Sequence, residues 1–124
     1  MIKANKPLNG QIQHELTSWL RLIEFLRQEN ALLKYRLSEL VDNSDDPNFL
    51  QIAEYFQNEF LIKDEALKKL IKDLRDYSDI IQKQEQVLTH PLITHNKLRK
   101  EISQFQEKYS SLSTEFNKKM LQNN

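Results

Sequence analysis

The sequence contains no cysteine, a single glycine (Gly10) and three prolines among its 124 residues. Without cysteine it can form no disulfide, thiol nucleophile or cysteine-ligated metal site. One glycine excludes glycine-rich phosphate loops, and a β-rich fold would need many more glycine-containing turns. No apolar run approaches the roughly 18 residues of a membrane-spanning helix, and residues 1–10 lack the apolar stretch of a signal peptide. We therefore expect a soluble, cytoplasmic, all-α protein.

Apolar residues recur at the spacing of amphipathic helices. The first stretch keeps steps of three and four and is polar at only one position: Leu16, Trp19, Ile23, Leu26, Asn30, Leu33, Leu37 and Leu40. Residues spaced in this way lie on one stripe of a helix and pack against a partner helix. Two later stretches keep the same spacing: Phe49, Ala53, Phe56, Phe60, Lys63, Leu67, Leu70, Leu74, Tyr77, Ile81, Gln84 and Leu88, then His95, Leu98, Ile102, Phe105, Tyr109, Leu112 and Phe116.

Prolines and polar residues divide the chain into three predicted helices, at about 9–41, 47–88 and 92–121, with residues 1–8 and 122–124 flexible. Asp46 is well placed to cap the second helix, and Pro47 suits a first helical position. Pro91 lacks an amide proton and disfavours helical backbone in the residue before it. The chain therefore either reverses near residues 89–95 or continues as one kinked helix.

We favour the reversal, because it buries three apolar faces together. It also brings an acidic segment beside a basic one: residues 44–88 carry six basic and ten acidic side chains, whereas residues 89–124 carry six and three. We expect these two segments to form ion pairs with each other. The predicted fold is a single domain over residues 1–124, an elongated antiparallel three-helix bundle with coiled-coil-like packing.

The first helix carries a second apolar set on a different face: Leu22, Phe25, Leu32 and Tyr35. A helix that is apolar on two faces needs two neighbours, so we expect it to be the most buried of the three. Tyr35 and Tyr55 lie off the main stripes and are candidates for a partner-binding surface. Leu22, Phe25 and Leu32 are further candidates for such an interface, and Asn30 for an interface or register role. The strict spacing also allows two chains to pair, which leaves a homodimer open.

Asn30 is the polar member of the first stripe. A buried asparagine at such a position lowers stability but can select the register or the number of chains. We hypothesise that it pairs with a polar group across the stripe, either in this chain or in a second copy. The alternative is that Asn30 lies in a loosely packed, hydrated part of the bundle.

The sequence contains no motif typical of a catalytic or metal-binding site. No glutamate is followed three residues later by histidine, and no HExxH motif occurs, so neither a di-iron bundle site nor a zincin site is predicted. We expect structural or solvated roles for His90 and His95, no catalytic residue, no metal and no cofactor. The interpretation as a nucleic-acid-binding protein depends on two basic helix faces. One contains Lys68, Lys69, Lys72 and Arg75, and the other contains Lys97, Arg99 and Lys100. DNA-binding domains are usually basic. This chain as a whole carries no net charge.

Two segments, AEYFQNEFLIKDEALKKLIKDL (residues 53–74) and HNKLRKEISQFQEKYSSLSTEFNKKM (residues 95–120), resemble a family of small bacterial helical proteins without an established function. Together they make up 48 of the 124 residues. The resemblance implies a cytoplasmic protein and transfers no catalytic or ligand-binding residue.

The function that we expect is therefore non-enzymatic. A protein–protein interaction or self-association module, acting as an adaptor or regulator, fits the patterns best. The first alternative is a nucleic-acid-associated accessory protein that uses the basic helix faces. The second is a small-molecule binder with a pocket between helices.

Overall fold

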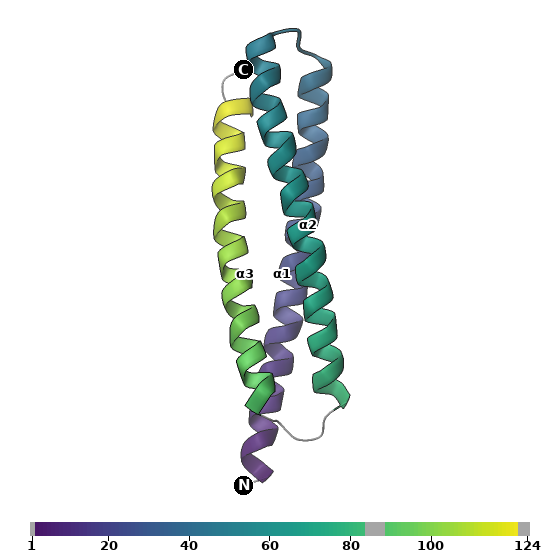
Figure 1. Cartoon of the computed structure of the whole chain (residues 1–124), viewed down its shortest axis with the longest axis vertical. Helices are drawn as coiled ribbons and strands as arrows, with labels where there is room; N and C mark the ends of the chain where they lie inside the picture. The colour runs from purple at the N-terminus through teal and green to yellow at the C-terminus, as the bar shows by residue number, and fades with distance from the viewer. Residues whose placement is uncertain (1, 84–88, 122–124) are drawn as a thin grey trace.

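The computed structural model describes the backbone of residues 2–83 and 89–121, and the side chains of residues 10–83 and 93–121. These residues form three α-helices and no strand: α1 (Ile2–Asp42), α2 (Pro47–Lys83) and α3 (Thr89–Phe116), followed by a π-helical segment at Asn117–Leu121. The helices lie side by side in an elongated bundle, with the α1–α2 turn at one end (Figure 1). The all-α three-helix bundle is thus confirmed.

Ring contacts show that the chain reverses between α2 and α3. The rings of Phe56 and Phe116 are 5.3 Å apart at one end of the bundle, and those of Tyr77 and His95 are 5.7 Å apart towards the other. Later residues of α3 therefore meet earlier residues of α2, so the two helices are antiparallel and the single kinked helix is excluded.

The expected start of the third helix is wrong, because α3 begins at Thr89 and Pro91 is its third residue. A proline is tolerated there, since the first amides of a helix have no partner within it. The expected end of the second helix, residues 84–88, lies outside the described residues, and so does the tail 122–124, which is predicted to be flexible.

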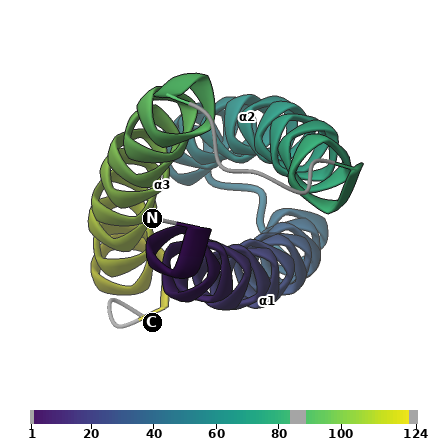
Figure 2. The ribbon, with the colours of Figure 1, turned by 90° about the horizontal axis from the view of Figure 1, so that it is seen from below.

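The three stripes meet along the bundle axis and form its core. Figure 2 looks along the bundle and shows the helices around a common centre. The large side chains Phe56, Phe60 and Phe116 are fully buried there, and the rings of Phe60 and Phe116 pack edge to face at 5.2 Å. Lys63 has 12% of its side chain exposed and lies 3.9 Å from Glu59, which lets its aliphatic stem pack inwards.

The start of α2 has the helix cap that the sequence predicts. At the start of α2, the Asn48 amide donates to Oδ1 of Asp46 at 3.0 Å, and the Leu50 amide donates to the Asp46 carbonyl at 2.9 Å. The predicted cap is therefore confirmed.

The prediction that α1 starts near residue 9 after a flexible segment is wrong, because α1 begins at Ile2 and continues through Pro7. A proline costs helix stability without always ending the helix.

The second apolar set of α1 is largely exposed among the residues that the structure describes. Phe25, Leu32 and Tyr35 are 58%, 45% and 63% exposed, and only Leu22 packs partly against the core. The expectation that α1 is buried on two faces is therefore wrong. In a bundle of three helices around one axis, each helix faces both neighbours with a single stripe, so the opposite face of α1 needs no covering helix.

The charge pairing between the acidic and basic segments is also different from that expected. Within the described residues, no ion pair joins α2 to α3. The interhelical ion pairs instead connect α1 to each of the others, through Lys34 and Asp64 and through Glu15 with Arg99. Most of the remaining ion pairs join residues one turn apart on α2, where the opposite charges of neighbouring side chains neutralise each other.

Candidate functional site

A buried polar contact joins α1 and α2 halfway along the bundle. Asn30 is fully buried, and its Nδ2 donates to the Phe60 carbonyl at 3.1 Å and to Oδ1 of Asp64 at 2.7 Å. The other carboxylate oxygen of Asp64 accepts a charge-assisted bond from Lys34. The hypothesis of a polar pair across the stripe is confirmed, and the partner belongs to the same chain.

Two buried atoms near this contact have no hydrogen-bond partner among the described residues: Oδ1 of Asn30 and the hydroxyl of Tyr109. Burial raises the pKa of Tyr109 strongly, and the nearby carboxylates of Glu29 and Asp64 add to the effect. Tyr109 therefore lies near Asp64 in the same part of the bundle. A buried polar atom without a partner costs free energy, so this polar layer is locally less stable than an apolar one would be.

A second polar cluster ties α3 to α1 nearer the other end of the bundle. Nε2 of His95 lies 2.9 Å from Oε1 of Glu15, and Arg99 approaches the same carboxylate at 2.7 Å. The His95 ring lies 4.6 Å from the Trp19 ring. The guanidinium carbon of Arg99 lies 5.9 Å from the Trp19 ring centroid, within reach of a cation–π interaction.

The electrostatics of this cluster follow from these contacts. The hydrogen bonds from His95 and then Arg99 lower the pKa of Glu15 below its ordinary value. Burial raises the pKa of Tyr77, whose ring lies 5.7 Å from His95, to about 12. Nδ1 of His95 is buried without a hydrogen-bond partner among the described residues. The cluster binds two helices together through charge and ring packing.

Whether Glu15 and His95 could take part in catalysis or metal binding depends on the side chains around them. The Glu15–His95 pair has the form of a carboxylate-oriented imidazole. The other described contacts of the His95 ring are with the rings of Trp19 and Tyr77, and no described serine or threonine is hydrogen-bonded to it. Among the described residues, no group of three acidic or histidine side chains could hold a metal ion. His90 has no described side chain.

Of this cluster, only the positions of the two rings could be predicted from the sequence. Trp19 and His95 both lie on predicted core stripes, which is why they meet. Glu15 and Arg99 flank those stripes, and nothing in their own spacing indicates a contact across 84 residues. Asp64 was missed as the partner of Asn30 for the same reason.

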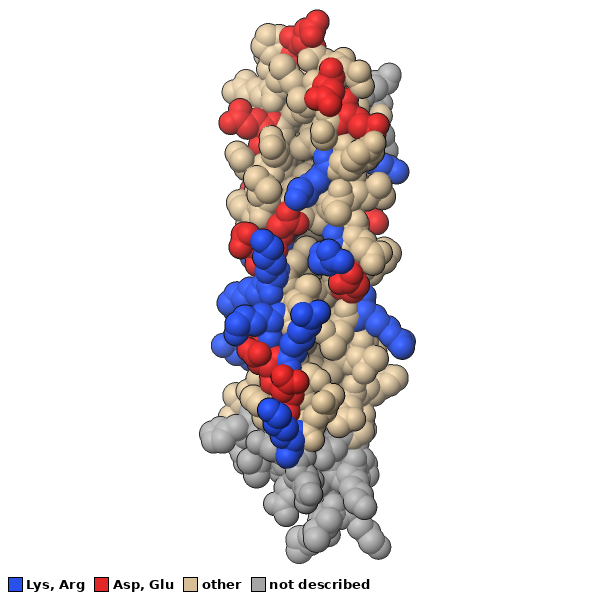
Figure 3. Space-filling view, turned by 90° about the vertical axis from the view of Figure 1, so that its right-hand side faces the viewer, with Lys and Arg blue, Asp and Glu red and all other residues tan. Residues whose placement is uncertain are grey.

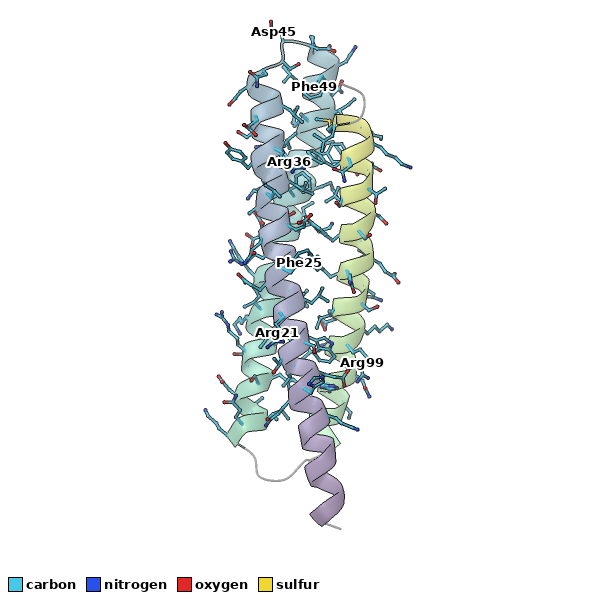
Figure 4. The ribbon with its side chains drawn as sticks, turned by 180° about the vertical axis from the view of Figure 1, so that it is seen from behind. Arg21, Phe25, Arg36, Asp45, Phe49 and Arg99 are labelled. Atoms are coloured by element: carbon cyan, nitrogen blue, oxygen red, sulfur yellow. The ribbon has the colours of Figure 1, made fainter. Side chains whose placement is uncertain are left out.

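The candidate interface residues separate into two places. Phe25, Leu32 and Tyr35 share the side of α1 that faces away from the bundle, and we call them the outer face of α1. Figure 4 shows Phe25 there, between Arg21 and Arg36 along the same helix. Tyr55 is on α2 instead, 49% exposed, with its ring 5.1 Å from that of Phe56 and its pKa raised by nearby Glu115 of α3. The structure therefore does not bring Tyr55 together with the α1 residues.

Several basic side chains line a groove between α1 and α2. It is lined by Leu20, Glu24, Arg27, Lys68, Ile71, Lys72, Arg75 and Asp76. Most of the cations have acidic partners: Arg27 pairs with Glu24, and Lys72 pairs with Asp76 at 2.9 Å. Figure 3 shows the resulting mixture of basic and acidic side chains on this face.

No protein-family model, curated protein or solved structure matches this chain. In the part of the chain that the structure describes, no helix combines the length and the apolar character needed to cross a bilayer.

Proposed function

We propose that this chain is a non-enzymatic protein–protein interaction module of the cytoplasm, acting by self-association or as an adaptor or regulator, and that the outer face of α1 is its contact surface. The observation that carries the proposal is the exposure of Phe25, Leu32 and Tyr35 on one side of a single helix. Large apolar residues grouped on a surface are typical of interaction sites, and aromatic residues dominate binding energies at such sites.

The geometry favours a helix as the complementary surface. The three side chains follow one another at steps of seven and three along α1, so they form a narrow strip. A strip of this kind fits the apolar side of another amphipathic helix, which buries anchors at the same spacing. Burial of apolar area is worth about 25 cal/mol per Å², so three such side chains are a substantial driving force.

The test is a double substitution, Phe25→Ser with Leu32→Ser, compared with a matched control, Leu61→Ser with Ile80→Ser. The control residues are 46% and 48% exposed on α2, so both variants remove two exposed apolar side chains. Solution mass is measured by light scattering, and partner proteins are recovered with the tagged full chain from an extract of its native cells. We expect the α1 variant to lose associations that the control retains. Retention of every association by the α1 variant would overturn the proposal.

A second candidate function is nucleic-acid association through the α1–α2 groove, where Arg27, Lys68, Lys72 and Arg75 converge. The adjacent acidic partners weaken this candidate, because they neutralise the cations that would contact phosphate. Retention on a DNA column that falls steeply with salt, and that is lost in an Arg75→Glu variant, would favour it. Retention unaffected by Arg75→Glu would remove the groove from consideration.

A further inference from the structure

We propose that the outer face of α1 pairs antiparallel with the same face of a second copy of this chain, around a two-fold axis at the level of residue 30. This inference rests on the proposed function and names the partner. It begins from a second regular spacing on α1, opposite the buried stripe. We call the six residues of this spacing the outer stripe, and all are exposed: Arg21, Phe25, Gln28, Leu32, Tyr35 and Glu39.

The outer stripe has the pattern of a helix-pairing seam. Its steps are four, three, four, three and four residues, the alternation that keeps side chains in line along a supercoiled helix pair. Its central positions carry three apolar side chains, Phe25, Leu32 and Tyr35, together with the polar Gln28. Its two ends carry charges of opposite sign, Arg21 and Glu39. A solvated helix face has no need of such an order.

The order selects the antiparallel orientation. When two copies run in opposite directions with residue numbers that add to 60, Arg21 lies opposite Glu39 of the second copy, Phe25 opposite its Tyr35, and Gln28 opposite its Leu32. All six positions then have a partner, and each contact occurs twice around the axis. A parallel pair would place Arg21 on Arg21 and Glu39 on Glu39, and like charges at close range oppose association.

The charges at the ends are free to pair in this way. Neither Arg21 nor Glu39 forms an ion pair with any residue that the structure describes, whereas other cations on α1 do, such as Arg27 with Glu24. Between the two charged ends, the Phe25–Tyr35 contact occurs twice and supplies aromatic packing on either side of the axis. Aromatic pairs contribute to association beyond the apolar area that they bury.

The first test exchanges the charges. Arg21→Glu and Glu39→Arg each place like charges together at both ends of the seam, and the double variant restores opposite charges. We expect each single variant to weaken the dimer about tenfold and the double variant to recover most of the loss, as measured by sedimentation across a concentration series. Lys100→Glu, an exposed charge reversal on α3, serves as the control and should leave the dimer unchanged.

The second test measures orientation directly. Because the chain has no cysteine, one introduced cysteine carries one spin label. In the antiparallel pair, labels at Ala31 lie near the axis and should be within about 20 Å of each other. Labels at Gln13, at about 1.5 Å per residue on either side of residue 30, should be about 50 Å apart. A parallel pair would give similar short distances at both sites.

The outcomes separate this inference from the proposed function. Dimers with twice the 14.9 kDa mass, charge exchange that recovers association, and short Ala31 with long Gln13 distances support the antiparallel pair. A monomeric wild-type chain, single charge variants that dimerise normally, or short distances at both labels would overturn it. A monomer that still recovers a partner through Phe25 and Leu32 would leave the proposed function standing.

Discussion

Nδ2 of Asn30 lies 2.7 Å from Oδ1 of Asp64, so the most buried polar side chain of α1 is held by a charged residue of α2. Its Oδ1 has no partner among the described residues. The contact therefore combines one strong bond with one desolvated acceptor, and its net effect on stability follows from their balance.

We expect Asn30→Leu to raise the stability of the bundle, because it removes a buried acceptor without a partner, while Asp64 keeps its bond to Lys34. The expected gain is about 1 kcal/mol, whereas Asn30→Ala should lose about 2 kcal/mol through the cavity that it leaves. Urea unfolding measures both. Unchanged stability, unchanged solution mass and an unchanged denaturant slope in Asn30→Leu would argue against a role of Asn30 in register.

Tyr109→Phe should also stabilise the fold. The Tyr109 hydroxyl is buried and has no hydrogen-bond partner among the described residues, so removing it relieves a desolvation cost of about 1 kcal/mol. Tyr55→Phe changes an exposed hydroxyl and is the control, with an expected effect within about 0.5 kcal/mol. Thermal unfolding followed by circular dichroism compares the two. A clear loss of stability in Tyr109→Phe would mean that the hydroxyl is hydrogen-bonded in solution.

The Glu15 cluster predicts a dependence of stability on pH. Because the hydrogen bonds from His95 and Arg99 lower the pKa of Glu15 in the folded chain, the ionised carboxylate stabilises the fold above its ordinary pKa of 4.5. This contribution disappears as the pH falls through the lowered folded-state pKa. Glu15 is 38% exposed, so solvent screens it and the effect is modest.

We therefore expect Glu15→Gln to lower the melting temperature by about 2–4 °C at pH 7 and by less at pH 3. Glu54→Gln, an exposed carboxylate on α2, is the control and should show no such dependence. Melting curves at a series of pH values supply the measurement. Equal losses for Glu15→Gln at both pH values would contradict the assignment of the effect to the ionised carboxylate.

The cap of α2 can be tested with two neighbouring residues of the same type. Asp46→Ala removes the acceptor of the Asn48 amide and should cost about 1 kcal/mol. Asp45→Ala removes an exposed carboxylate one residue earlier and should stay within about 0.5 kcal/mol. Equal effects of the two would show that charge near the helix end matters more than the hydrogen bond.

The parts of the fold that were predictable are those that depend on one helix at a time. Spacing along a helix decides which side chains share a stripe, so the buried positions from Leu16 to Phe116 followed from the sequence. The Asp46 cap depends on residues two to four positions away and was predicted for the same reason.

The parts that were not predictable depend on how helices meet. The partner of Asn30 is Asp64 because α1 and α2 pair in one particular register, and no local pattern contains that register. The outer face of α1 was expected to be covered because apolar residues usually are. Three helices around one axis leave that face open, which only their arrangement in space reveals.

The direction of the helices has a consequence for the entropic cost of folding. α1 and α2 are joined by a short turn, so they can form a hairpin with little loss of chain entropy. α3 returns parallel to α1, and the Glu15–His95 contact closes a loop of 80 residues. A longer loop loses more chain entropy when it closes, so the Glu15–His95 contact has to offset a larger entropic cost than the contacts beside the turn between α1 and α2.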